Sequence, residues 1–87
     1  MLGADFSAVS DEDMTKLGIS GGVRIDKLEP GKLRSAGIRE GFIITNIDKK
    51  PINTIDDLMS ALDNKTGGIL IEGIYPNGTR AYYAFGL

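Results

Sequence analysis

The segment at residues 31–62 has the sequence GKLRSAGIREGFIITNIDKKPINTIDDLMSAL. Its pattern predicts a small capped turn, a buried strand, a tight turn and an amphipathic helix, in that order. The helix is the most informative part. Thr54 is a suitable N-cap residue, and Asp56 and Asp57 place negative charge in the first turn, where the helix dipole favours it. We therefore expect the main helix of the protein to begin directly after Thr54.

The apolar residues of this helix cover a wide arc. They are Ile55, Leu58, Met59, Ala61 and Leu62, and at 100° per residue they span roughly 160°. Contact with a single core needs a narrower stripe, so the helix has room for two apolar surfaces. We expect Leu58 and Ala61 to close the core, and Ile55, Met59 and Leu62 to line a groove open to a ligand. The alternative, that all five fill the core, fits the pattern equally well.

Composition excludes several classes of function. The 87 residues suffice for one domain, spanning 1–87, that buries about 60 to 65% of its unfolded surface. The net charge is −2, with ten Lys and Arg scattered among twelve Asp and Glu, so no basic patch is expected for nucleic acid or an anionic membrane. No apolar run reaches the 18 residues of a membrane span. We expect a soluble domain whose targeting signal, if any, lies outside this sequence.

Histidine and cysteine are both absent from the sequence. Their absence removes the usual general base, the commonest zinc ligand, thiolate chemistry and disulfides together. We therefore expect no catalytic residues, no metal and no cofactor, and the chain by itself is not expected to be an enzyme.

The rest of the chain predicts short strands and turns around this segment. Residues 2–9, LGADFSAV, alternate with a period of two, which places Leu2, Ala4, Phe6 and Ala8 on one face of a strand. Further strands are expected at residues 23–28, 42–47, 68–75 and 80–85, and short helices at 10–16 and 31–37. Strands outnumber helices without a regular βαβ alternation. The expected fold is α+β, a partly open and mostly antiparallel barrel or sandwich of five to six strands with one main helix and one or two short ones.

The order of these pieces resembles a known family. LGADF at residues 2–6 and GVRIDKLEPGKLRSAGIREGFIITNIDKKPINTIDDLMSAL at residues 22–62 resemble the PDZ domains of bacterial Deg/HtrA (Do)-type periplasmic serine proteases. The final strand, which ends with YYAFGL at residues 82–87, resembles the C-terminal PDZ domain of a two-PDZ protein of this family more than the first. The resemblance covers nearly the whole chain and is most specific at residues 33–52. The family usually has Asp after the second Gly of this run, where the present chain has Phe42.

The resemblance implies a peptide-binding groove and assigns its residues. Backbone N–H groups of the loop Leu2-Gly3-Ala4 would hold a peptide carboxylate, as successive backbone donors in a tight loop can. An extended peptide would then be added as a strand to the neighbouring segment, between it and the main helix. The pairing strand would consist of Asp5, Phe6, Ser7 and Ala8. The groove-facing helix residues would be Ile55, Met59 and Leu62.

The resemblance also implies a function. The domain would capture C-terminal or extended apolar segments of unfolded proteins, for substrate recognition or regulation of an attached Deg/HtrA-type serine endopeptidase in the periplasm of a Gram-negative bacterium. The alternative is a structural domain that docks protease subunits into an oligomer with its groove blocked. Expected partners are such peptide segments, the protease domain and sister subunits. The chain's own end, residues 85–87, has the apolar pattern of a ligand for a neighbouring copy; alternatively, Phe85 is fixed in the last strand.

Overall fold

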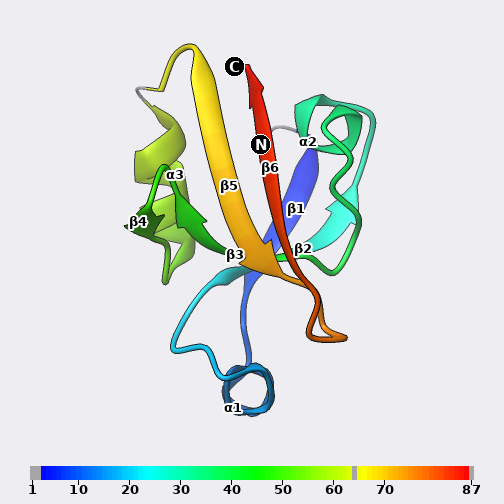
Figure 1. The fold of residues 1–87 in the computed structure, drawn as a ribbon, viewed down its shortest axis with the longest axis vertical. Coiled ribbons are helices and arrows are strands. Elements are labelled where there is room, and N and C mark those ends of the chain that lie inside the picture. Colours follow the sequence, from blue (N-terminus) through cyan, green and yellow to red (C-terminus); the bar gives the residue numbers. More distant parts are fainter. Residues whose placement is uncertain (1–2, 64, 87) are drawn as a thin grey trace.

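The computed structural model describes residues 3–63 and 65–86. Its short strands and helices confirm the expected α+β composition (Figure 1). In chain order they are β1 (Ala4–Ala8), α1 (Asp11–Leu17), β2 (Val23–Leu28), α2 (Lys32–Ser35), β3 (Ile43–Ile47), β4 (Lys50–Pro51), α3 (Ile55–Asp63), β5 (Gly68–Ile74) and β6 (Arg80–Gly86). None of the helices within the described ranges is long and apolar enough to cross a membrane.

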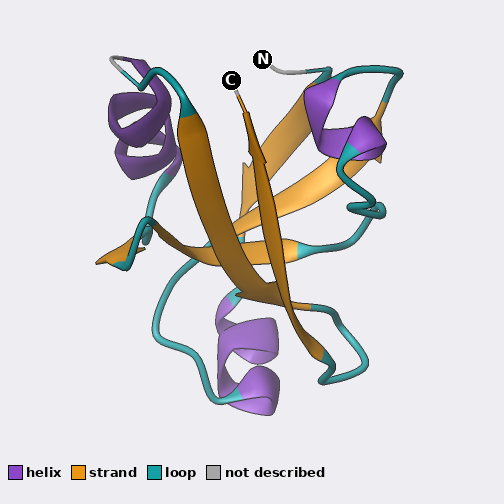
Figure 2. Ribbon diagram, turned by 45° about the horizontal axis from the view of Figure 1, so that its top comes forward, coloured by secondary structure: helices purple, strands orange, loops and turns teal. Residues whose placement is uncertain are grey.

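The six strands form one antiparallel sheet. Its order is β1-β2-β3-β5-β6, and β4 pairs with β3 to the side of this path. The sheet is strongly twisted, so that β5 and β6 cross in front of β1 and β2 (Figure 2). Helices α3 and α2 flank it on opposite sides, and α1 lies at the end away from both chain ends (Figure 1). Within the described residues, β1 and β6 therefore lie at the two ends of this order, and each pairs with one strand only.

The core is built from the apolar faces of the strands and helices. Leu58 of α3 and Leu33 of α2 are each 1% exposed and belong to one large cluster with the inward residues of β2, β3 and β5. A smaller cluster of Val9, Ile43 and Ile74 is covered by the apolar side of α1. The strand expected at residues 68–75 is confirmed as β5, and it lies between β3 and β6.

Both longer helices begin at the residues that the sequence indicated. The Ser10 side chain accepts a hydrogen bond from the Asp13 N–H at 3.1 Å, which caps α1. At α3, Thr54 Oγ1 accepts from the Asp57 N–H at 3.1 Å, and Asp57 Oδ2 accepts from the Thr54 N–H at 3.2 Å. This reciprocal pair is a capping box, and it fixes where α3 starts beside the sheet.

The far end of α3 is tied to the sheet through Asp48. This residue follows β3 in a left-handed turn with φ 50°. Its carboxylate receives Lys65 Nζ at 2.7 Å and the Leu70 N–H at 2.9 Å. The hydrogen bond with Lys65 and the one with Leu70 lower the pKa of Asp48 below its ordinary value. The loop after α3 is thereby connected to the β3–β4 turn and to β5.

The first strand differs from the expected alternation. Its pairing with β2 has a β-bulge between Asp5 and Phe6. Ala4 is buried and Phe6 is half-buried as expected, but Ala8 is exposed and the next residue, Val9, is buried. The prediction that Ala8 lies on one face with Ala4 and Phe6 is therefore wrong, because the strand ends at Ala8 and the chain turns Val9 into the smaller cluster with Ile43 and Ile74.

The end of the chain pairs regularly up to Gly86. Phe85 lies in β6 opposite Ile69 of β5, and its half-buried side chain packs against the main core cluster. The alternative in which Phe85 is fixed in the last strand is thus confirmed. Leu87 lies outside the described residues, so the expectation of a self-ligand remains a prediction.

Candidate functional site

The structure places β1 next to α3 and leaves it at the edge of the sheet. Strand β1 pairs with β2 on one side, and no other strand among residues 3–63 and 65–86 pairs with it. Helix α3 contacts β1 directly. An edge strand beside a helix can accept an extended peptide as an additional strand, with main-chain hydrogen bonds on one side and side-chain contacts on the other.

The apolar residues of α3 divide between the core and the surface. Leu58 is 1% exposed, whereas Ile55 is 36% and Met59 is 50% exposed. Ala61 and Leu62 are half-buried and pack against the edge of the main cluster. The helix therefore has two apolar surfaces, as its arc predicted, and Leu62 lies at the boundary between them.

The loop before β1 is held by a glycine that no other residue can replace without strain. Gly3 has φ 76°, and its carbonyl accepts a hydrogen bond from the Glu29 N–H at 2.7 Å. A Cβ at this position would lie 3.3 Å from the carbonyl oxygens of both Glu29 and Pro30. The predicted carboxylate loop is thus anchored to the turn after β2 at Gly3, while its first residue, Leu2, lies outside the described residues.

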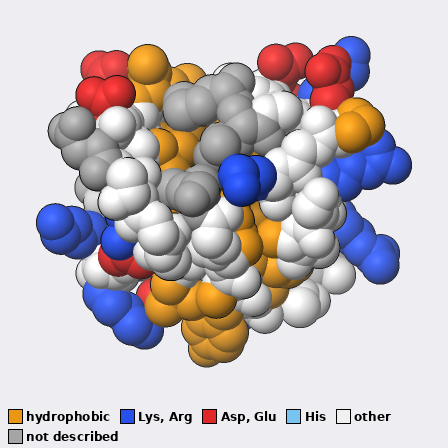
Figure 3. All heavy atoms as spheres, turned by 90° about the horizontal axis from the view of Figure 1, so that it is seen from above, with side chains coloured by type: hydrophobic (Ala, Val, Ile, Leu, Met, Phe, Trp, Pro, Cys, Tyr) orange, Lys and Arg blue, Asp and Glu red, His pale blue; other side chains and the backbone are white. Residues whose placement is uncertain are grey.

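The strand residues predicted to pair with a peptide differ in exposure. Asp5 and Ala8 are exposed, whereas Phe6 and Ser7 are half-buried, with Phe6 packed against the core. A small pocket of about 110 Å³ lies at the start of the strand and is lined by Gly3, Ala4, Asp5, Lys27 and Glu29. Figure 3 shows the molecule from the top of the view in Figure 1. On this face hydrophobic side chains reach the surface, and most charged side chains lie at its periphery.

An aromatic cluster on the other side of the molecule was not expected from the sequence. Phe42 is fully buried, with its ring centroid 4.8 Å from that of Tyr75 and 5.3 Å from that of Tyr83, the latter edge to face. Such tilted and edge-to-face contacts are the favoured aromatic geometries. The departure at Phe42 is therefore a packing feature, since the ring that replaces the usual Asp supports two tyrosines from the β5–β6 hairpin.

Known proteins resemble this chain in three-dimensional structure, whereas searches by sequence find no match. No family model matches the chain, and no curated protein does. Among solved structures, the HtrA3 PDZ domain bound to a phage-derived ligand (FGRWV) matches with a TM-score of 0.82 at 17% identity, covering 99% of this chain and 82% of that one.

Two structures of the HtrA-type protease AlgW also match. The one with a decapeptide has a TM-score of 0.74 at 21% identity, and the one with a tripeptide has 0.79 at 22%. Each match covers 99% of this chain, but the chain spans only 28% and 30% of the respective AlgW chains.

The chain therefore has the fold of a PDZ domain. More narrowly, its backbone matches the PDZ domains of HtrA-type proteases over nearly all of its length, which confirms the resemblance seen in the sequence at the level of the fold.

Proposed function

We propose that this chain is a peptide-binding module that captures C-terminal or extended apolar segments of unfolded proteins by adding them to β1. The observation that carries the proposal is the pairing of an edge strand with a helix that exposes Ile55 and Met59 beside it. Exposed apolar side chains next to unpaired strand edges are the elements that β-augmentation requires. The matching HtrA3 and AlgW structures contain peptides, which supports the same assignment.

Each part of the groove has a distinct role in this proposal. The loop Leu2-Gly3-Ala4 receives the terminal carboxylate through backbone N–H groups. Residues 5–8 supply the main-chain partners of the peptide. Leu2, Ala4 and Leu62 surround the last ligand side chain, and Ile55 favours an apolar residue two positions before the end. Met59 lies between these two contacts on α3, one helical turn beyond Ile55.

The module would act in a larger protein. We infer that it serves substrate recognition or regulation of an attached Deg/HtrA-type serine endopeptidase in the periplasm, with that protease domain and sister subunits as its further partners. The structural match of this chain to about 30% of the HtrA-type protease AlgW supports this context. The chain itself contains no histidine for a triad, so catalysis would come from the attached domain.

Peptide titration by calorimetry tests the proposal. A peptide with apolar residues at the last and third-last positions should bind with a Kd on the order of micromolar, about −8 kcal/mol. Amidation of its terminal carboxylate should weaken binding strongly, because the backbone N–H groups of the loop Leu2-Gly3-Ala4 would lose an anionic acceptor. Equal affinity for the acid and the amide, or a preference for Ser or Thr at the third-last position, would contradict the proposed site.

A further inference from the structure

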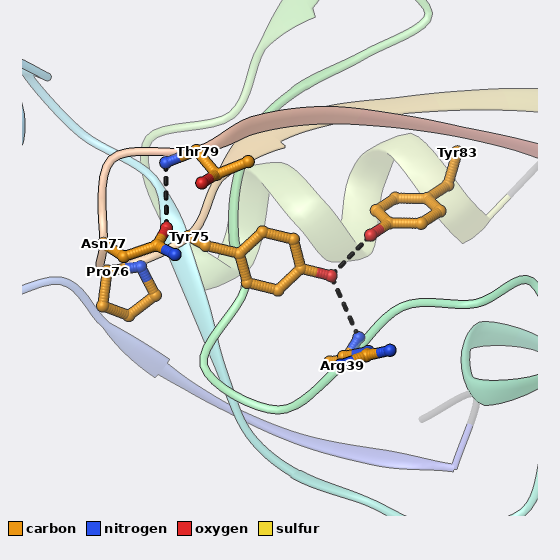
Figure 4. A pocket seen from close by; sticks show the side chains of 6 residues that line it. All are labelled: Arg39, Tyr75, Pro76, Asn77, Thr79 and Tyr83. Atoms are coloured by element: carbon orange, nitrogen blue, oxygen red, sulfur yellow. Dashed lines mark hydrogen bonds between the residues drawn. The ribbon is translucent and has the colours of Figure 1, made fainter.

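A second pocket of about 470 Å³ lies between the loop after α2 and the β5–β6 hairpin (Figure 4). Six residues line it: Arg39, Tyr75, Pro76, Asn77, Thr79 and Tyr83. None of them belongs to the peptide groove. The hairpin turn lies at the end of β6 opposite the chain terminus (Figure 1). The volume of this pocket is in the range of small-molecule sites.

The two tyrosine hydroxyls leave one hydrogen-bond donor to spare. Tyr75 Oη accepts a hydrogen bond from the Arg39 backbone N–H at 3.2 Å and lies 2.5 Å from Tyr83 Oη. Only one of the two hydroxyl hydrogens can lie between these oxygens. Whichever it is, the other has no acceptor within the part of the chain that the structure describes. The pair therefore presents one O–H donor to a ligand.

The Tyr83 hydroxyl stays protonated over the ordinary pH range. Burial and the hydrogen bond with Tyr75 raise the pKa of Tyr83 to about 12, while the nearby positive charge of Arg39 lowers it by a smaller amount. A hydroxyl that accepts one hydrogen bond and donates another is also polarised toward stronger donation. The hydroxyl pair is thus a fixed donor beside a cation.

The only formal charge in the lining of this pocket is positive. Within residues 3–63 and 65–86, Arg39 has no carboxylate within ion-pair distance. Asn77 Oδ1 accepts from the Thr79 N–H at 2.9 Å, so the side-chain NH₂ of Asn77 remains a donor at the rim. Guanidinium, hydroxyl and amide donors together suit an anionic acceptor.

The walls of the pocket are apolar. The rings of Tyr75 and Tyr83 pack against the buried ring of Phe42. Pro76 lies beside Tyr75 at the turn (Figure 4). Aromatic faces held by a packed side chain are rigid contact surfaces, which lowers the entropy cost of binding a flat or aliphatic group. The pocket therefore offers an apolar surface as well as a positive charge to a ligand.

We propose that this pocket is a second binding site, which takes a carboxylate carried on an apolar group. The guanidinium of Arg39 and the free hydroxyl hydrogen hold the carboxylate, and the tyrosine and proline surfaces contact the apolar part. The carboxylate belongs either to a small organic acid or to a polypeptide. This site is independent of the peptide groove proposed above.

Titration of the ¹⁵N-labelled chain followed by NMR tests the site with defined probes. The probe is 3-phenylpropionate, and its controls are 3-phenylpropionamide, which lacks the charge, and acetate, which lacks the apolar group. A fourth arm uses the capped dipeptide amide acetyl-Phe-Asp-NH₂ to present a carboxylate on a polypeptide. All arms use the M59E variant, so that carboxylate binding in the peptide groove does not contribute.

The acid should shift the amides of residues 39 and 79 with a Kd on the order of millimolar, as expected for a fragment of this size. The amide and acetate should bind at least about tenfold more weakly. Saturation by 3-phenylpropionate alone supports a small-acid site, and saturation by the dipeptide supports a polypeptide site. Equal shifts from the acid and its amide, or no shift at these residues from either carboxylate, would overturn the proposal.

Single substitutions test which side chains donate hydrogen bonds to the carboxylate of 3-phenylpropionate. Arg39→Gln should weaken the acid at least about tenfold, since one charge-assisted hydrogen bond is lost. Arg34→Gln, at an arginine that lines a neighbouring pocket but not this one, should leave the affinity unchanged. Tyr83→Phe should weaken the acid less than Arg39→Gln, because the Tyr75 hydroxyl then has no tyrosine partner and still presents its hydrogen. An unchanged affinity in Arg39→Gln would refute the assignment even if Tyr83→Phe failed to fold.

Discussion

The proposed peptide groove between β1 and α3 and the proposed second site around Arg39, Tyr75 and Tyr83, called the tyrosine pocket below, differ in the groups that they offer a ligand. The groove combines a strand edge with apolar side chains on α3, and its proposed donors are backbone groups. In the tyrosine pocket the proposed donors are the side chains of Arg39 and Asn77 and the hydroxyl pair of Tyr75 and Tyr83, which lie beside the ring of Phe42. Backbone donors tolerate sequence change, whereas side-chain donors do not. The first surface can therefore persist at 17 to 22% identity, while the second depends on the particular side chains of this chain.

The largest expected effect comes from truncating Phe42, the buried ring against which Tyr75 and Tyr83 pack. Phe42→Ala should lower the free energy of unfolding by about 3–5 kcal/mol, because a fully buried ring is replaced by a cavity. Urea unfolding measures this loss. Binding of 3-phenylpropionate should fall while peptide binding to the folded fraction persists, which would separate the two regions. If the variant does not fold, Phe42→Leu provides the same comparison with a smaller cavity.

A charge placed on α3 should reduce the peptide affinity of the proposed groove most directly. Met59→Glu should weaken an apolar C-terminal peptide by about 10- to 100-fold, or about 1.4–2.8 kcal/mol, because a carboxylate would be desolvated next to the ligand. Calorimetry measures the loss. Ser60→Glu is the matched control, since Ser60 is also exposed but points about 100° away around the same helix and should retain full affinity. Equal losses in both variants would show a general effect on the helix instead of a contact.

The loop before β1 is tested by Gly3→Ala. The positive φ and the two carbonyl oxygens 3.3 Å from the new Cβ should together cost about 1–2 kcal/mol of stability. Peptide affinity should also fall several-fold as the loop shifts. Gly67→Ala is the control, because Gly67 has φ 79° but a Cβ added there would meet no atom within 4 Å. A similar stability loss in both variants would mean that backbone strain alone, without the close carbonyl contacts, determines the effect.

The smallest effect is a dependence of stability on alkaline pH. Below pH 10, Tyr83 is protonated in both the folded and the unfolded chain. Because its pKa is raised to about 12 in the fold, the unfolded chain ionises first, and stability should fall between pH 10 and pH 12. Tyr83→Phe should reduce this fall in urea midpoint, whereas Tyr82→Phe, at a side chain 69% exposed, should not. Identical pH profiles for the native chain and Tyr83→Phe would contradict the raised pKa.

The sequence predicted the groove side of the molecule better than the tyrosine pocket. Thr54, Asp57 and the apolar arc of α3 act within a few residues of each other, so local periodicity and capping preferences were sufficient to locate the helix. Arg39, Tyr75 and Tyr83 come together only when the α2–β3 loop reaches the β5–β6 hairpin, and no local pattern connects them. The departure at Phe42 was visible in the sequence, but the contacts of its ring with Tyr75 and Tyr83 were not.

The end of β1 was also beyond the sequence pattern. Strict alternation of Ala4, Phe6 and Ala8 describes a regular strand, but Val9, the residue after β1, is buried in a cluster with Ile43 and Ile74. These two partners lie far along the chain, so only the assembled sheet reveals that Val9 is buried and that Ala8 is exposed.

The short length of β1 has a consequence for the length of any guest chain. The residue skipped in the pairing of β1 with β2 is Asp26, so the bulge belongs to β2, and β1 itself runs from Ala4 to Ala8 without an inserted residue. A guest added along the free edge of β1 would pair over these five residues at most, because the next residue, Val9, is buried in the smaller cluster. If the proposed function holds, guest residues beyond this stretch should each contribute less to affinity than the terminal ones.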